Sequence, residues 1–181
     1  MRKVIVALLV LLTLGFGAAA YLLYFDTYHF AIVQPGVLYR DGFQGMRRFE
    51  NAYRQRPFKT VVNFQSDQDV VQYQVDVDAS RAFCVEHGIQ WNHIPIKQHT
   101  PPTQVQIDAF LKIVRDPANR PVYCHDNQGV VREGMMVAVW QKEGMGYDYD
   151  ACVAAIRFRS HASERDATAL MDFIKKLYNK N

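Results

Sequence analysis

The segment between Pro121 and Gln141 constrains the fold of this chain more than any other. A short apolar run, Pro121–Cys124, precedes the polar octapeptide His-Asp-Asn-Gln-Gly-Val-Val-Arg at residues 125–132, and a largely apolar stretch follows. This order predicts a buried strand, a tight loop and a helix that is buried on most sides. Successive backbone N–H groups of such a loop and the helix N-terminus converge on one point, which favours an anion there.

Short apolar runs alternate with helical periodicity along the rest of the chain. We expect strands near residues 36–40, 60–64 and 91–96, and helices near 46–56, 75–86, 103–114, 132–141, 150–158 and 163–177. Thr103 and Gln106 are spaced as a capping box. The alternation predicts an α/β fold with a mostly parallel central sheet flanked by helices. We expect one domain over residues 36–181, preceded by a tether at 26–35.

The N-terminus predicts a membrane segment. Arg2 and Lys3 precede 22 largely apolar residues, 4–25, which is enough to span about 30 Å of hydrocarbon as a helix. We interpret residues 1–25 as a transmembrane signal anchor that places the domain on the exported side, periplasmic or extracellular. The alternative is a cleaved signal peptide with its site at residues 18–20, although the apolar run continues past that site.

The charge balance and the cysteine spacing argue against two kinds of ligand, nucleic acid and metal ions. The net charge is +3, and without Arg2 and Lys3 the chain has 19 basic and 18 acidic residues. This balance argues against nucleic-acid binding. Cys84, Cys124 and Cys152 lack metal-ligand spacing, so we expect buried thiols, with a Cys84–Cys152 disulfide left open. No metal or cofactor is predicted.

The octapeptide resembles the His-Cys-x-x-Gly-x-x-Arg motif of the cysteine-dependent protein tyrosine and dual-specificity phosphatases. Asp126 falls at the family's nucleophilic cysteine, and Glu133 falls where the family usually carries serine or threonine. The resemblance to a bacterial branch of this superfamily covers roughly residues 36–160. It implies a dual-specificity phosphatase-like fold with a phosphate-binding loop formed by His125, Asp126, Asn127, Gln128, Gly129, Val130, Val131 and Arg132.

The chemistry of this class needs a thiolate nucleophile, a ring of donors with a bidentate arginine, and an acid for the leaving group. Arg132 matches the arginine, although an ion pair with an unrelated carboxylate is the alternative. Asp126 is a weaker nucleophile than a thiolate. We expect its carboxylate to accept hydrogen bonds from the loop amides and Arg132 and so to mimic a ligand. For His125 the resemblance implies loop organisation, and a plain core histidine is the alternative.

The remaining candidates are weaker. Cys124 lies two residues before the nucleophile position, which predicts a core cysteine. The loop at residues 97–102, where the family often carries its acid, has no carboxylate, so His99 is a weak acid candidate. Asp67 and Asp69 either reach the site or begin a helix. Glu133 with Asp126 could bind a metal, but two acids beside an arginine favour an internal ion pair.

The hypothesis that best fits these residues is a membrane-anchored, exported pseudophosphatase that acts by binding. Its partner is an anionic or phosphorylated ligand, or a protein, at the loop, and residues 4–25 contact the membrane. The alternative is an active phosphomonoesterase with atypical aspartate-based chemistry. A third option is a purely structural module at the membrane surface.

Overall fold

A computed structural model of the chain describes residues 2–24, 26–27, 29–157 and 163–180. Phe25 and Phe158, which end the predicted apolar run and one predicted helix, lie outside the described residues. The sheet has the strand order β1-β2-β5-β3-β4. Only the β1–β2 pair is antiparallel, so the predicted mostly parallel sheet is confirmed. The strands are β1 (Ala31–Gln34), β2 (Leu38–Gly42), β3 (Thr60–Asn63), β4 (Gln90–His93) and β5 (Val122–Asp126).

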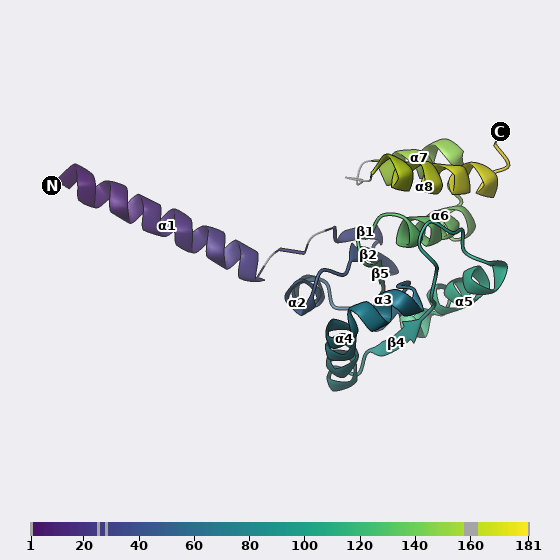
Figure 1. Cartoon of the computed structure of the whole chain (residues 1–181), viewed down its shortest axis with the longest axis horizontal. Helices are drawn as coiled ribbons and strands as arrows, with labels where there is room; N and C mark the ends of the chain where they lie inside the picture. Colours follow the sequence, from purple (N-terminus) through teal and green to yellow (C-terminus); the bar gives the residue numbers. More distant parts are fainter. Residues whose placement is uncertain (1, 25, 28, 158–162, 181) are drawn as a thin grey trace.

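Helices cover both faces of the sheet (Figure 1). One face packs against α2 (Met46–Gln55) and α4 (Gln74–Glu86). The other face is covered by α5 (Gln104–Arg115) and α6 (Arg132–Glu143), and α7 (Tyr149–Arg157) and α8 (Glu164–Leu177) pack against α6. The short helix α3 (Asp67–Gln72) follows β3, and a 3-10 turn, η1 (Pro117–Asn119), precedes β5.

Strand β5 shows how the chain builds a core on each face. Val122 and Cys124 belong to the core beneath α6, whereas Tyr123 between them belongs to the aromatic core beneath α2 and α4. Alternate side chains of a strand point to opposite faces, so a strand covered on both sides must be apolar throughout. Helix α6 is buried from Arg132 through Gln141, as its sequence predicts.

Side chains fix the starts of three helices. Thr103 and Gln106 form the predicted capping box of α5, and Ser163 accepts a hydrogen bond from the Asp166 amide at the start of α8. Ser66 and Asp69 form a further capping box at α3. Such caps satisfy amides that the first helical turn leaves without partners.

The three cysteines are free and buried. Cys84 lies in the core beneath α2 and α4, and Cys152 lies in the core on the opposite face. The disulfide that the sequence left open is therefore absent from the described residues.

Three strands differ from the sequence-based expectation. Strand β1 lies within residues 26–35, which were predicted to be a tether, because this edge strand is defined by its pairing with β2 rather than by its own pattern. The next strand begins at Leu38 rather than Gly36, since Gly36 adopts a φ of 69° in the turn between β1 and β2. Strand β4 ends at His93, before Pro95, which has no N–H to donate.

Helix α1 (Arg2–Tyr24) projects away from the domain (Figure 1). Its Lys3–Tyr21 segment is the one helix among the described residues that is long and apolar enough to cross a membrane, and none of it is buried in the domain. A signal sequence near the N-terminus has the same length and composition.

Candidate functional site

The site lies at the carboxyl ends of three neighbouring parallel strands. Gly42 at the end of β2 aligns with Asp126 of β5, and Asn63 at the end of β3 aligns with His125. The chain then passes through residues 127–131 and enters α6 at Arg132. In sheets of this kind ligands bind at the carboxyl ends of the strands, so the topology brings the predicted loop to the expected edge.

The loop lies directly against strand β2, and glycines make this approach possible. Gly129 has a φ of 67°, and a Cβ atom there would lie 2.5 Å from the Gly42 nitrogen. A Cβ atom on Gly42 would lie 2.5 Å from the Gln128 carbonyl. The Arg40 guanidinium donates a hydrogen bond to the Gly129 carbonyl oxygen over 2.8 Å. The positive φ and the contact between backbones both favour glycine at position 129.

The Asp126 carboxylate accepts hydrogen bonds from the loop. Its Oδ1 accepts from the amides of Gln128 at 2.8 Å and Gly129 at 2.5 Å. Its Oδ2 lies 3.4 Å from the Glu133 amide and 3.5 Å from Arg132 Nε. The residue is 2% exposed. The carboxylate therefore occupies donors that an anionic ligand would need.

Arg132, the first residue of α6, contacts a second carboxylate. Its Nη1 pairs with the Asp69 carboxylate and lies 3.5 Å from the Ile96 carbonyl oxygen. Asp69 also accepts a hydrogen bond from the Asn127 side-chain amide at 2.9 Å. Burial raises the pKa of Asp69, but hydrogen bonds from Ser66 and the charge of Arg132 outweigh burial and hold that pKa below its usual value. Asp69 thus both begins α3 and reaches the loop, whereas Asp67 is exposed.

Glu133 forms an internal ion pair, but with an arginine that the sequence did not single out. Its carboxylate lies 2.5 Å from Arg40 Nε and accepts from Arg40 Nη2 at 2.7 Å. Both side chains are at most 5% exposed. Within the part of the chain that the structure describes, no group of three His, Cys, Asp or Glu residues is arranged to hold a metal ion.

His125 corresponds to the core-histidine alternative. Its ring lies 5.2 Å from the Phe43 ring and 5.6 Å from the Tyr123 ring. Nδ1 lies 3.4 Å from the Asp126 carbonyl oxygen, and Nε2 has no hydrogen-bond partner among the described residues. Burial lowers the pKa of His125 to about 4, so the ring is neutral at pH 7.

Cys124 is buried in the core beneath α6. Burial raises the pKa of this thiol well above its usual value, and the negative charge of Glu133 adds to the effect. A protonated, buried thiol is a poor nucleophile.

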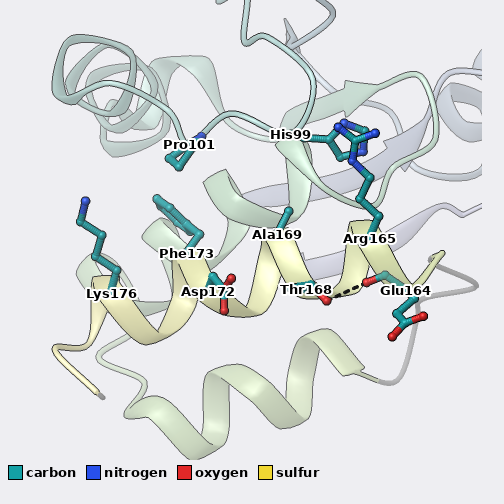
Figure 2. A pocket seen from close by; sticks show the side chains of 9 residues that line it. All are labelled: His99, Pro101, Glu164, Arg165, Thr168, Ala169, Asp172, Phe173 and Lys176. Atoms are coloured by element: carbon teal, nitrogen blue, oxygen red, sulfur yellow. Dashed lines mark hydrogen bonds between the residues drawn. The ribbon is translucent and has the colours of Figure 1, made fainter.

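His99, the weak acid candidate, lines a different cavity from that of the loop. This cavity, of about 720 Å³, lies between α8 and the segment that carries His99 and Pro101 (Figure 2). His99 Nε2 lies 2.7 Å from the Asp166 carboxylate. Burial raises the pKa of Asp166, but its contacts with Ser163 and His99 outweigh burial and lower it. His99 itself does not line the cavity above the loop, although its partner Asp166 does.

A polar cavity of about 380 Å³ opens above the loop. It is lined by three carboxylates, one guanidinium, five carboxamides, a phenol and a valine: Asp69, Asp126, Asp166, Arg132, Gln44, Gln72, Gln98, Asn127, Gln128, Tyr73 and Val131. Acidic groups therefore outnumber basic ones in its lining.

Sequence reasoning missed several residues that hold the loop. Gln44 donates to the Asn127 carbonyl oxygen at 2.6 Å, and the Gln65 side chain donates to the Asn127 side chain. Arg40 was also missed. Gln44 and Gln65 follow β2 and β3 by two residues, and polar residues just after parallel strands are a signal that could have indicated them.

Solved structures share this fold. The active form of Tk-PTP superposes with a TM-score of 0.63 at 18% identity, covering 84% of this chain and 98% of that one. TpbA from P. aeruginosa, solved in complex with pTyr, superposes with a TM-score of 0.59 at 20% identity, covering 85% of this chain and 92% of that one. The domain therefore has the same fold as these two proteins.

Comparison of sequences identifies the family of the chain. Residues 50–175 match the family model PTP-NADK, described as a DSP-PTPase phosphatase fused to NAD+ kinase, and the chain belongs to this family. NAD kinase 2 of Arabidopsis thaliana is 32% identical over 87 residues, and the probable NAD kinase 2 of Oryza sativa is 28% identical over 85 residues. Each match covers 47% of this chain but only 8% of the plant protein.

Proposed function

We propose that the protein is a membrane-anchored pseudophosphatase whose domain works on the exported side by binding rather than by hydrolysis. The observation that carries the proposal is the Asp126 carboxylate, which accepts hydrogen bonds from the Gln128 and Gly129 amides. In the motif of the family this position belongs to the nucleophilic cysteine. A carboxylate there attacks phosphorus less readily than a thiolate and uses donors that would otherwise bind the phosphoryl oxygens.

The surroundings also argue against hydrolysis. A leaving group needs a proton, and an efficient donor has a pKa near the working pH. Asp69, the carboxylate that lies beside Arg132, has a lowered pKa and is ionised at pH 7. His99 lines the other cavity. We therefore assign no proton donor to the loop.

The cavity above the loop is the binding site that we propose. TpbA, which shares the fold of this domain, was solved in complex with pTyr. An anionic ligand is therefore one candidate. In this chain, however, carboxylates already contact Arg132 and two loop amides. We propose instead a segment of a protein partner that hydrogen-bonds to the carboxamides lining the cavity.

The experiment is an assay of the full chain, purified in detergent without metal, with an aryl phosphate as substrate. We expect no phosphate release above background, and no change on Asp126→Ala or Arg132→Ala substitution. The unfolding temperature should also change little on addition of phosphate or vanadate. An aspartate-based phosphomonoesterase would release phosphate, and both substitutions would abolish that activity. That result would overturn the proposal.

A further inference from the structure

Two carboxylates from different parts of the fold divide the anion-binding groups of the loop between them. Asp126, at the end of β5, accepts from the Gln128 and Gly129 amides. Asp69, at the start of α3, pairs with the Arg132 guanidinium and accepts from the Asn127 side chain. A bound phosphate needs backbone amides and the arginine fork at the same time. Asp126 therefore occupies the amides and lies beside Nε of the arginine, whereas Asp69 occupies its Nη1.

Asp69 is fixed in this position by its own helix. Ser66 is the N-cap of α3, and its amide and hydroxyl both donate to Asp69 Oδ2, at 3.0 and 2.7 Å. The other carboxylate oxygen, Oδ1, accepts from Asn127, whose side chain is also bonded to Gln65. These bonds hold the carboxylate against Arg132 without any ligand. Its lowered pKa keeps it charged at neutral pH.

We infer that Asp69 is a specificity-determining residue, a second internal anion that excludes phosphate from the cavity above the loop. This inference rests on the proposed function, because it concerns the ligand selectivity of the same site. Asp126 alone leaves one edge of Arg132 open, and Asp69 pairs with that arginine at Nη1. A phosphate that enters the cavity must displace the carboxylates of Asp69 and Asp126 from their hydrogen-bond donors. It is also repelled by the negative charges of Asp69, Asp126 and Asp166 in the cavity wall.

A double-substitution experiment tests the inference without relying on catalysis. The variants are Asp126→Ser, Asp69→Asn and their combination in the full chain, and the probe is inorganic phosphate, followed by calorimetric titration. Each single variant frees one half of the donors and should bind phosphate weakly. The combined variant should bind at least about tenfold more tightly than either single variant, because charge-assisted hydrogen bonds from Arg132 are added to those of the amides.

Asp67→Asn provides the matched control. It removes the same charge from the same helix two residues away, at an exposed position. In the Asp126→Ser background it should leave phosphate affinity within about twofold, since exposed charges are screened by salt. An equal gain from Asp67→Asn and Asp69→Asn would mean that only net charge matters and would overturn the assignment of Asp69.

Asp69→Gln is a second variant in case the asparagine disturbs α3. Glutamine is a normal capping-box residue at this position, so it keeps an acceptor for Ser66 while removing the charge. The inference is wrong if neither neutral variant increases phosphate affinity in the Asp126→Ser background. That failure differs from a failure of the proposed function, which would appear as aryl phosphate hydrolysis by the unsubstituted chain.

Discussion

At the scale of single residues, burial decides what the loop side chains can do. Asp126 and Arg132 are 2% and 4% exposed, and both have charged or hydrogen-bonding partners. His125 is 1% exposed and surrounded by aromatic rings. The sequence predicted which residues form the loop because they are contiguous. It left open whether Asp69, 63 positions before Arg132, reaches the site, and the structure places Asp69 against the same guanidinium.

The buried His125 predicts a pH-dependent stability. Its folded-state pKa is about 4, below the ordinary histidine value of 6.5, so between these pH values the unfolded chain binds a proton that the folded chain does not. The free energy of unfolding should therefore fall as the pH drops from about 6.5 towards 4, by about 3 kcal/mol from this group. Urea unfolding of the full chain in detergent at several pH values measures this loss.

The variant His125→Leu should flatten that pH dependence, whatever its effect on stability at neutral pH. His87→Leu is the matched control, since it removes an exposed imidazole. A slope in the His125 variant that equals the slope in the unsubstituted chain would contradict a neutral, buried His125.

At the scale of elements, local signals and long-range pairing contribute differently. The capping box of α5, the apolar periodicity of α5 and α8 and the burial of α6 could be predicted, because each depends on neighbouring residues. Strand β1 could not, because Ala31–Gln34 is short and becomes a strand through its pairing with β2. The packing of the loop against β2 could not be predicted either, because it joins segments that are distant in the sequence. Gly129 was the only sequence signal for this contact.

Gly129 and Gly36 give a matched pair of substitutions that isolates this packing. Both have a φ near 68°, but a Cβ atom meets nothing within 4 Å at Gly36 and meets the β2 backbone at Gly129. Gly36→Ala should cost about 1–2 kcal/mol of unfolding free energy, from backbone strain alone. Gly129→Ala should cost about 2–5 kcal/mol, because overpacking adds to the strain.

Urea unfolding of both variants gives the comparison. Similar losses of unfolding free energy in Gly36→Ala and Gly129→Ala would contradict this prediction, because they would mean that the loop moves away from β2 at little energetic cost. The same substitution at Gly42 should resemble Gly129→Ala, since a Cβ atom there would lie 2.5 Å from the Gln128 carbonyl.

At the scale of the whole molecule, the domain and the N-terminal helix are distinct parts. Helix α1 projects from the domain (Figure 1). Apolar side chains along it are exposed; Leu12 and Phe16, for example, are 68% and 78% exposed. The composition indicated this division, since the strongly apolar run ends where the mixed α/β pattern begins. Side-chain exposure of this kind is unfavourable in water and favourable in a bilayer.

We therefore expect the full chain, expressed in bacteria, to stay with the membrane after an alkaline carbonate wash. A variant lacking residues 1–25 should not associate with the membrane. Protease added from the exported side should digest the domain of the full chain. Recovery of a soluble protein that begins near residue 21 would instead support the cleaved signal peptide.

The internal pairing of Arg132 with Asp69 and Asp126 has a consequence for the environment in which the domain works. An anion-binding loop whose arginine is already paired with carboxylates of the same chain gains little stability from dissolved phosphate. The shape of the loop should therefore be the same in phosphate-poor and phosphate-rich surroundings.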